Sequence, residues 1–521
     1  MTSLNELSQL VPLIEDTPSF TDVVNALRNG HSGAIDGAWG SSSALCTAAI
    51  SNSCPGTLLV ILPRLNEVDD FALDLAGLSK HQPQVFPAWE SAPTEHDVTD
   101  ATFGGRLRLL RQLNEASAPL VVTSLTALLQ PVPSQQSRQS GSCTLQVGQE
   151  LELEPFLEWL VERGFQRVAA ITAQGEFSLH GGILDLYPAD TFEPLRVEFF
   201  GDEIESIRAF DPETQRKTED LQTVSFTLIK PPQLDSAAQA AAPENVESLF
   251  DSLPENSWVV FVELEEAISE SRHYLTRLDD PRGFYSIEST LEKATQCPSV
   301  TIARIAADSY ETSCHLQVES IERFSGPRSE VLLELASITD KQERVLIACH
   351  NEGERERLTE LLEESELTIG QGVSLCLGRI QHGFRLVRNQ IIVISDHELF
   401  GRSDLHRVKQ KRRWESRAID SFLDLKEGDL VVHLTNGIGR FRGIHQLDKE
   451  GQVEEHLQLE FRDNVKVYVP VALIHLVQKY VGSSKVAPKL SKLGSSSWSR
   501  KKNRSPKQSR TSPVICCACR L

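Results

Sequence analysis

Two largely apolar runs constrain the fold of the first part of the chain more than any other feature. They are "GTLLVILP" at residues 56–63 and "APLVVTSL" at residues 118–125. Apolar runs without alternation are typical of strands buried on both faces, as in a parallel sheet. The segment 104–116 between them has the spacing of an amphipathic helix. These patterns predict an α/β layer arrangement.

The chain continues well beyond this unit, because a length of 521 residues favours roughly three to five domains. From residue 145 to 229 the pattern changes to short alternating strands and turns, and residues 259–278 restore a strand followed by a helix. Residues 344–350, 352–365 and 389–396 then predict strand, helix and strand of a second α/β unit.

Residues 425–481 predict a small antiparallel barrel of the SH3 or Tudor type, a class that usually serves in protein interactions. Turns are expected at Thr435–Gly437 and at Asp463–Asn464, and Pro470 is expected to end the last regular strand. The alternation assigns six residues to one apolar face: Leu457, Leu459, Phe461, Val465, Val467 and Val469.

Charge is distributed unevenly along the chain. The net charge of −21 combines 28 basic and 61 acidic residues before Gly401 with 24 basic and 12 acidic residues from Gly401 onward. A body this acidic repels phosphate backbones, so we expect protein partners for the first 400 residues. The basic segment 406–417 is interpreted as a solvated linker helix; together with residues 501–510 it would give only weak, salt-sensitive DNA binding.

The composition also indicates location and metal content. No apolar run approaches the roughly 18 residues that span a bilayer, and the first residues lack the pattern of a secretion signal. Ten scattered cysteines without paired metal spacing predict a reducing, cytoplasmic location and no metal site. Cys516, Cys517 and Cys519 lack a fourth zinc ligand, and the basic tail 499–521 is expected to be disordered.

The stretch "GAWGSSSA" has the place of a phosphate-binding loop but not its chemistry. A working loop needs glycine N–H groups around the phosphates, a lysine on the β/γ-phosphates and a hydroxyl on Mg²⁺. Gly37 and Gly40 remain, but Ser42 replaces the last glycine, Ser43 the lysine and Ala44 the hydroxyl residue. No acidic strand end follows as a convincing Mg²⁺ partner. We therefore predict a tight turn that binds no nucleotide, and no catalytic residue.

The strand "LRVEFF" at residues 195–200 carries a candidate recognition residue. Alternation places Leu195, Val197 and Phe199 on one face and Arg196, Glu198 and Phe200 on the other. If the first face is buried, Phe200 lies exposed beside Arg196, a combination typical of protein-recognition hot spots. The alternative, that another domain covers Phe200, has equal weight on the sequence alone.

Several stretches together resemble one bacterial family. "GGILDLYP" with "RVEFFGDEIESIRAFDPETQR" is similar to the domain shared by excinuclease B and the bacterial transcription-repair coupling factors. Four further stretches, at residues 86–96, 350–362, 396–402 and 425–482, resemble the coupling factors, and the resemblance extends to about Trp498. It implies a multidomain α/β and α+β protein: a degenerate P-loop-type α/β domain with an inserted α+β domain, a small α/β domain, and the barrel.

The resemblance also implies domain boundaries. Residues 1–144 and 230–327 form the two parts of the degenerate nucleotide-type domain, and residues 145–229 form the inserted domain. Residues 328–404 form the small α/β domain, 405–424 a basic linker and 425–482 the barrel. Residues 483–502 begin a connection to a translocase, and residues 503–521 form an aberrant tail.

Two partners follow from the resemblance. The inserted domain is similar to the one that binds excinuclease A, the partner protein of excinuclease B; Arg196 and Phe200 match two contact positions, and His180 stands at a third that is usually arginine. The barrel resembles the domain that binds the RNA polymerase β subunit. Its implied contact residues are Leu447, in the strand before the Lys449–Gln452 hairpin tip, together with Ile444 and Arg440. A monomer with weak or indirect DNA contact is expected.

Family members continue into a DNA translocase with its own ATP and Mg²⁺ site, whereas this sequence becomes Ser/Pro/Arg-rich and then Cys-rich. This pattern suggests a frameshift-truncated coupling factor with no cofactor and no motor activity. The leading interpretation is an adaptor between RNA polymerase and excinuclease A. The alternatives are a transcription regulator that acts through the barrel alone and an ATP-binding enzyme that uses residues 1–340.

Overall fold

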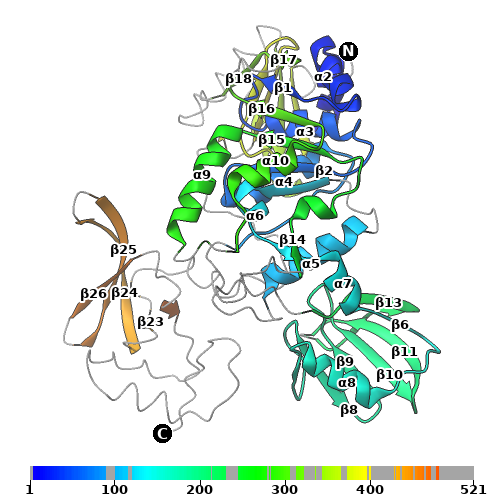
Figure 1. Ribbon diagram of the computed structural model, residues 1–521. Helices are drawn as coiled ribbons and strands as arrows, with labels where there is room; N and C mark the ends of the chain where they lie inside the picture. Colours follow the sequence, from blue (N-terminus) through cyan, green and yellow to red (C-terminus); the bar gives the residue numbers. More distant parts are fainter. Residues whose placement is uncertain are drawn as a thin grey trace. The chain divides into compact units, whose positions relative to one another are not determined.

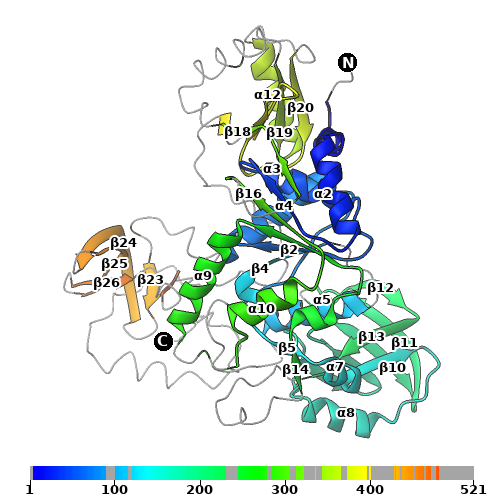
Figure 2. The same cartoon turned by 45° about the horizontal axis from the view of Figure 1, so that its top comes forward.

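The computed structural model describes residues 4–89, 100–114, 120–212, 214–229, 245–278, 281, 283–305, 312–321, 335, 343–364, 372–395, 398–399, 428, 430–433, 437–449, 452–462, 465–470 and 477–479. The chain divides into two compact units, Met1–Leu405 and His406–Leu521, which are described separately (Figures 1 and 2). Among the described residues, no helix has the length and apolar character needed to cross a membrane. The predicted linker 405–424, the connection 483–502 and the tail 503–521 lie outside the described residues.

The first unit is built on a seven-stranded parallel sheet, here called the parallel sheet, with the order β17-β1-β16-β15-β2-β4-β3. Its strands are β1 Gly33–Asp36, β2 Leu58–Leu62, β3 Gln84–Val85, β4 Leu120–Ser124, β15 Trp258–Val262, β16 Ser299–Ala303 and β17 Ser313–His315. The two predicted apolar runs are the neighbours β2 and β4, which are buried along their whole length. The prediction of parallel, doubly buried strands is confirmed.

Helices cover both faces of this sheet because successive strand residues point to opposite sides. Val60 of β2 belongs to one core cluster, and its neighbours Leu59 and Ile61 belong to the other. The first cluster includes residues of η1 Leu7–Leu10, α1 Val11–Glu15, α2 Pro18–Arg28, α3 Ser42–Ser51 and α4 Val68–Leu78, which follows η2 Leu65–Glu67. The second includes residues of α5 Ala101–Asn114, α6 Leu125–Leu128, α9 Leu264–Arg277 and α10 Ile287–Ala294. The predicted helix at 104–116 is α5 as far as Asn114.

An α+β domain is inserted between β4 and β15, after β5 Val132–Pro133 and α7 Gln135–Gly141. Its main sheet, here called the inserted sheet, has the order β12-β11-β10-β9-β8-β7. The elements are β6 Ser142–Gln146, α8 Leu153–Glu162, β7 Gln166–Arg167, β8 Glu176–His180, β9 Ile183–Leu186, β10 Leu195–Phe200, β11 Glu203–Phe210, β12 Lys217–Leu221 and β13 Thr223–Thr227. Helix α8 was not expected from the strand-and-turn pattern, although Phe156, Leu157 and Leu160 have helical spacing and are buried.

Two short elements return the chain to the parallel sheet, β14 Val246–Glu247 and η3 Leu249–Ser252. After β17, the chain forms a mixed sheet with the order β18-β21-β22-β19-β20. It contains β18 Val318–Ser320, β19 Arg344–Cys349, β20 Val373–Leu377, β21 Phe384–Leu386 and β22 Ile391–Ser395, with α12 Glu352–Glu364 after β19. Leu346 and Phe384 share the core cluster of Leu7 and Leu10, so the mixed sheet packs against the N-terminal helices. The strand, helix and strand predicted here are confirmed.

The second unit contains an antiparallel sheet with the order β26-β25-β24-β23-β27, here called the second-unit sheet. Its strands are β23 Leu430–His433, β24 Gly437–Lys449, β25 Gln452–Glu460, β26 Lys466–Pro470 and β27 Val477–Lys479. Leu457, Leu459 and Phe461 are buried as predicted, and Val467 packs against them. Val465, assigned to the same face, is 44% exposed, because it lies at the hairpin end, before β26 begins. The SH3-type barrel stays a prediction, and the residues of both predicted turns other than Gly437 lie outside the described ones.

Candidate functional site

The loop after β1 has the strand, turn and helix that its sequence predicts. Gly37 and Gly40 both adopt left-handed backbone conformations, with φ of +77° and +58°. A Cβ atom on Gly37 would lie 2.2 Å from the carbonyl oxygen of Leu316, and one on Gly40 would lie 2.8 Å from that of Gly383. The two glycines are therefore required by backbone conformation and by neighbouring protein backbone.

Backbone N–H groups of this loop donate to carbonyl groups of the protein. Ser42 N–H donates to the carbonyl oxygen of Trp39 at 3.2 Å, and Ser41 N–H donates to that of His382 at 3.0 Å. In a phosphate-binding loop, such N–H groups face the phosphate oxygens. Ser43, at the lysine position, uses its hydroxyl to donate to the carbonyl oxygen of Gly40 at 3.1 Å.

A turn of the mixed sheet, residues 379–383 between β20 and β21, lies against the loop. His382 N–H donates to Ser41 Oγ at 3.1 Å, and Gln381 N–H donates to Asp74 Oδ1 at 3.0 Å. The Ser41 hydroxyl in turn donates to Asp74 Oδ2 at 2.5 Å. The loop thus binds a segment of its own chain through main-chain and side-chain hydrogen bonds.

Asp74 of α4 is the centre of this contact. It is 3% exposed, and burial raises its pKa to about 7, opposed by the hydrogen bonds from Ser41 and Gln381. A carboxylate on the apolar side of α4, four residues before the buried Leu78, is the sequence signal that sequence reasoning missed.

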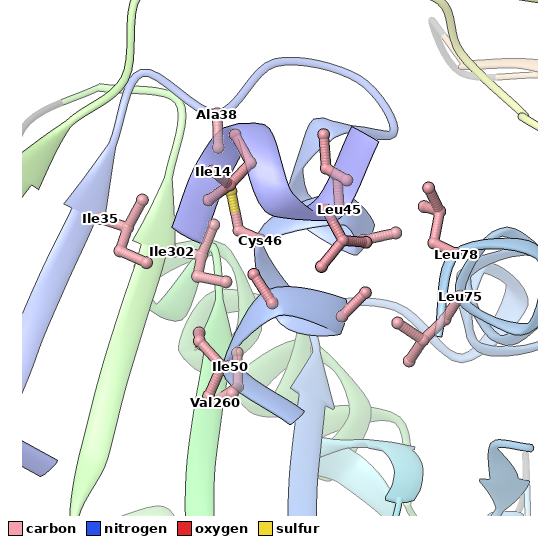
Figure 3. Packing of buried hydrophobic residues seen from close by; sticks show 14 of the residues in the cluster. Ile14, Ile35, Ala38, Leu45, Cys46, Ile50, Leu75, Leu78, Val260 and Ile302 are labelled. Atoms are coloured by element: carbon pink, nitrogen blue, oxygen red, sulfur yellow. The ribbon is translucent and has the colours of Figure 1, made fainter. Parts of the chain in front are cut away.

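Helix α3 after the loop is anchored almost entirely by apolar contacts. Leu45 and Cys46 of α3 lie among side chains from α1, α4 and the parallel sheet, including Ile14, Leu75 and Val260 (Figure 3). Burial raises the pKa of the Cys46 thiol above its usual range, so this cysteine is a packing residue.

An acidic residue, Glu263, stands at the carboxyl edge of the parallel sheet, where no convincing Mg²⁺ partner was expected. Glu263 comes directly after β15 and adopts a left-handed conformation with φ of +49°. Its carboxylate accepts hydrogen bonds from Arg304 N–H at 2.8 Å and from Arg304 Nε at 3.0 Å. The Glu263 carboxylate is therefore already engaged in an ion pair with Arg304. Within the described residues, no cluster of three or more metal-ligating side chains is found.

The exposed face of β10 presents the second candidate site. Leu195 and Val197 are buried, Phe199 is partly buried, and Phe200 on the other face is 79% exposed. The predicted division of the strand into two faces is confirmed. Of the two interpretations left open by the sequence, coverage of Phe200 by another described part of the chain is wrong.

Arg196 lies on the same face but is held by its own domain. Its Nε donates to Asp185 Oδ1 at 2.7 Å, and its Nη2 donates to Asp185 Oδ2 at 2.9 Å and to Gln215 Oε1 at 3.1 Å. The guanidinium also lies 4.5 Å from the centre of the Phe210 ring. The hydrogen bond to Asp185 raises the pKa of Arg196, whose side chain is 27% exposed.

His180 lies at the exposed end of β8, where it pairs with Ile183 of β9. Its Nε2 is 2.6 Å from the carbonyl oxygen of Ala169. Because Ile183 pairs in turn with Glu198 of β10, two residues before Phe200, His180 and Phe200 belong to one face. The structure thus brings all three predicted residues of the inserted domain onto the same side of the inserted sheet, together with Ile183, which sequence reasoning missed.

The three residues predicted for polymerase binding all lie on β24 of the second-unit sheet. The register pairs Arg440 with Glu460 and Leu447 with Glu454, both even-numbered positions of β25, whereas Ile444 pairs with Leu457. In the backbone register, Ile444 thus lies opposite an odd-numbered position of β25, unlike Arg440 and Leu447.

Comparisons with known proteins match two parts of the chain: the inserted domain and the second unit. Residues 143–228 match the family model described as "UvrB interaction domain", and residues 425–481 match that described as "CarD-like/TRCF RID domain". A transcription-repair-coupling factor of Bacillus subtilis is 25% identical over 96% of this chain and 49% of its own length. Those of Haemophilus influenzae and Staphylococcus aureus are 24% and 25% identical, over 90% and 85% of this chain and 47% and 45% of their own lengths.

The chain therefore spans about half the length of the curated relatives it matches. One chain thus matches both family models, and the relatives are similar to it along most of its sequence. By these matches, the chain is similar to transcription-repair-coupling factors along most of its length.

Proposed function

We propose that the chain acts as an adaptor in transcription-coupled DNA repair. In this proposal the inserted domain binds excinuclease A, and the second unit binds the β subunit of RNA polymerase. The observation that carries the proposal is the 79% exposure of Phe200 on the domain that matches the UvrB interaction domain. The match of residues 425–481 to the CarD-like/TRCF RID domain supports the second partner.

The exposed face has the properties of a recognition surface. An aromatic side chain that stays in water while its own domain has a complete core offers apolar area for a partner to bury. Phe200 stands beside the hairpin turn at Gly201, where φ is +67° and no atom lies within 4 Å of a Cβ position. A partner can therefore approach this edge without displacing any packed element.

Binding to excinuclease A is tested with the full chain and the purified partner, without ATP. We expect the wild-type chain to be retained and Phe200→Ala to weaken binding by about tenfold or more, because a central aromatic residue carries much of the binding energy. Phe192→Ala is the matched control: Phe192 is 70% exposed but lies against Arg108 of α5. Equal binding by wild type and Phe200→Ala would contradict the site.

Binding to polymerase is tested on the same chain with Leu447→Arg. We expect this variant to lose polymerase binding and to keep excinuclease A binding, because a charged residue would have to be buried at the contact with polymerase. Val465→Arg, at the 44% exposed hairpin end of the same sheet, is the control and should bind normally. A chain that binds polymerase but never excinuclease A would instead support a regulator that acts through the second unit alone.

We also propose that the loop at Gly37–Ala44 binds no nucleotide and that the chain has no motor activity of its own. The support is that Ser41 and Ser42 direct their N–H groups to protein carbonyls and that no lysine stands at Ser43. Titration of the full chain with ATP and Mg²⁺ should leave its thermal midpoint unchanged. Micromolar affinity would overturn this proposal and favour the ATP-binding enzyme.

A further inference from the structure

The inserted domain exposes a second large apolar residue next to Phe200. Ile183, the first residue of β9, is 38% exposed, whereas its neighbour Leu184 is completely buried in the core. Ile183 therefore contributes little to the core of its own domain.

Strand register brings Ile183 and Phe200 together. Ile183 pairs with Glu198 of β10, so Phe200 is its diagonal neighbour on the same face of the inserted sheet. The hairpin ends are also linked directly, because Phe199 N–H donates to the carbonyl oxygen of Gly182 at 2.8 Å. Diagonal pairs of this kind are close enough for large side chains to touch, so the two residues form one apolar spot.

The charged groups of this face differ in how they are used. Arg196 is bound to Asp185, and Arg208 is bound to Glu198, so these two arginines are neutralised within the domain. At the turn beside Phe200, in contrast, the exposed residues are acidic: Asp202 and Glu203, the latter paired with Phe200 across the hairpin. The apolar spot therefore has an acidic rim.

We propose that Ile183 is a further specificity-determining residue for binding of excinuclease A, an inference that rests on the proposed function. Ile183 and Phe200 enter one apolar pocket of the partner, and basic groups at the edge of that pocket face Asp202 and Glu203. Arg196 acts as a positioning residue: it holds Asp185 of β9 against β10 and so fixes the spacing of the two strands that carry the spot.

The test compares Ile183→Asp with Val161→Asp in the full chain. Val161 is 57% exposed on α8, whose buried residues share the core of Leu184 and Leu195 on the opposite side of the sheet. We expect Ile183→Asp to weaken excinuclease A binding by about tenfold or more and Val161→Asp to leave it unchanged. Ile183→Leu should keep most of the affinity, and Ile183→Ala should lose part of it.

The acidic rim is tested with Glu203→Lys, which should weaken binding by roughly three- to tenfold at low salt and less at high salt, because a rim charge is screened. Polymerase binding and the thermal midpoint serve as controls and should not change in any variant. If wild type fails to bind excinuclease A, the proposed function fails. If wild type and Phe200→Ala behave as proposed but Ile183→Asp binds like wild type, only the inference about Ile183 is overturned.

Discussion

The loop at Gly37–Ala44 and the face of β9 and β10 differ in what the chain does with a possible binding surface. The loop has the position of a ligand site, at the carboxyl edge of a parallel sheet, but Ser41 and Ser42 direct their N–H groups to protein carbonyls. The face has no special position in the sheet, but Phe200 and Ile183 remain 79% and 38% exposed. Position within a fold is therefore a weaker guide to binding than side chains that remain accessible.

The two surfaces differ in how much each would lower the free energy of unfolding if no partner contacted it. Buried polar groups without hydrogen bonds destabilise a fold, so a loop that loses its ligand is stable only when something else satisfies it. Here His382, in the turn at residues 379–383, does so for Ser41: its carbonyl oxygen accepts from Ser41 N–H, and its N–H donates to Ser41 Oγ. An exposed Phe or Ile destabilises the folded chain little and remains available to a partner.

The largest difference in stability between the loop and the exposed face is expected from glycine substitutions. Gly37→Ala should lower the free energy of unfolding by at least about 3 kcal/mol, because it adds a Cβ to a left-handed residue and brings it against backbone. Gly201→Ala, at φ +67° with open space around it, should cost only about 1 kcal/mol. Thermal and urea unfolding of both variants measure the difference. Equal costs would show that the loop is no tighter than an open hairpin.

A second, smaller effect concerns pH. The pKa of Asp74 is raised to about 7 by burial, so the folded chain holds this proton more tightly than the unfolded chain does. The free energy of unfolding should therefore fall as the pH rises from the unfolded pKa, near 4, to about 7, and this contribution should be constant above that.

Asp74→Asn removes this titration while it keeps an acceptor oxygen for Ser41 and Gln381. We expect the stability of wild type relative to Asp74→Asn to decrease by roughly 2 kcal/mol between pH 5 and pH 8. Urea unfolding at several pH values measures it. Parallel pH profiles for the two proteins would mean that Asp74 is not the titrating group of this contact.

The smallest expected effect is a difference in stability between substitutions of Arg196 and Phe200, which share the exposed face of β10. Arg196→Ala leaves Asp185, which is 8% exposed, without its bidentate partner and should lower stability by about 1–2 kcal/mol. Phe200→Ala should change stability by less than about 0.5 kcal/mol, because the side chain is already in water. Both variants should bind excinuclease A more weakly. If Arg196→Ala proves as stable as Phe200→Ala, Arg196 is a direct contact and not a positioning residue.

Much of this architecture could be predicted because local pattern and burial coincide. The runs at β2 and β4 show no alternation of apolar and polar residues that would give a water-facing side, so a doubly covered sheet accommodates them. In β10, alternation alone divided Leu195 and Val197 from Phe200. Helix α8 escaped prediction because its short apolar stripe lies among strands that dominate the local pattern.

The sequence by itself determined which chemistry is missing and which residues alternate. It determined that no lysine follows Gly37 and Gly40 in the loop and that Phe200 is opposite in face to Val197. Only the tertiary structure decided what fills the loop, because the turn at residues 379–383 is more than 300 residues away along the chain. It also decided that Ile183 joins Phe200, because strand register is a property of pairing between segments and not of either segment alone.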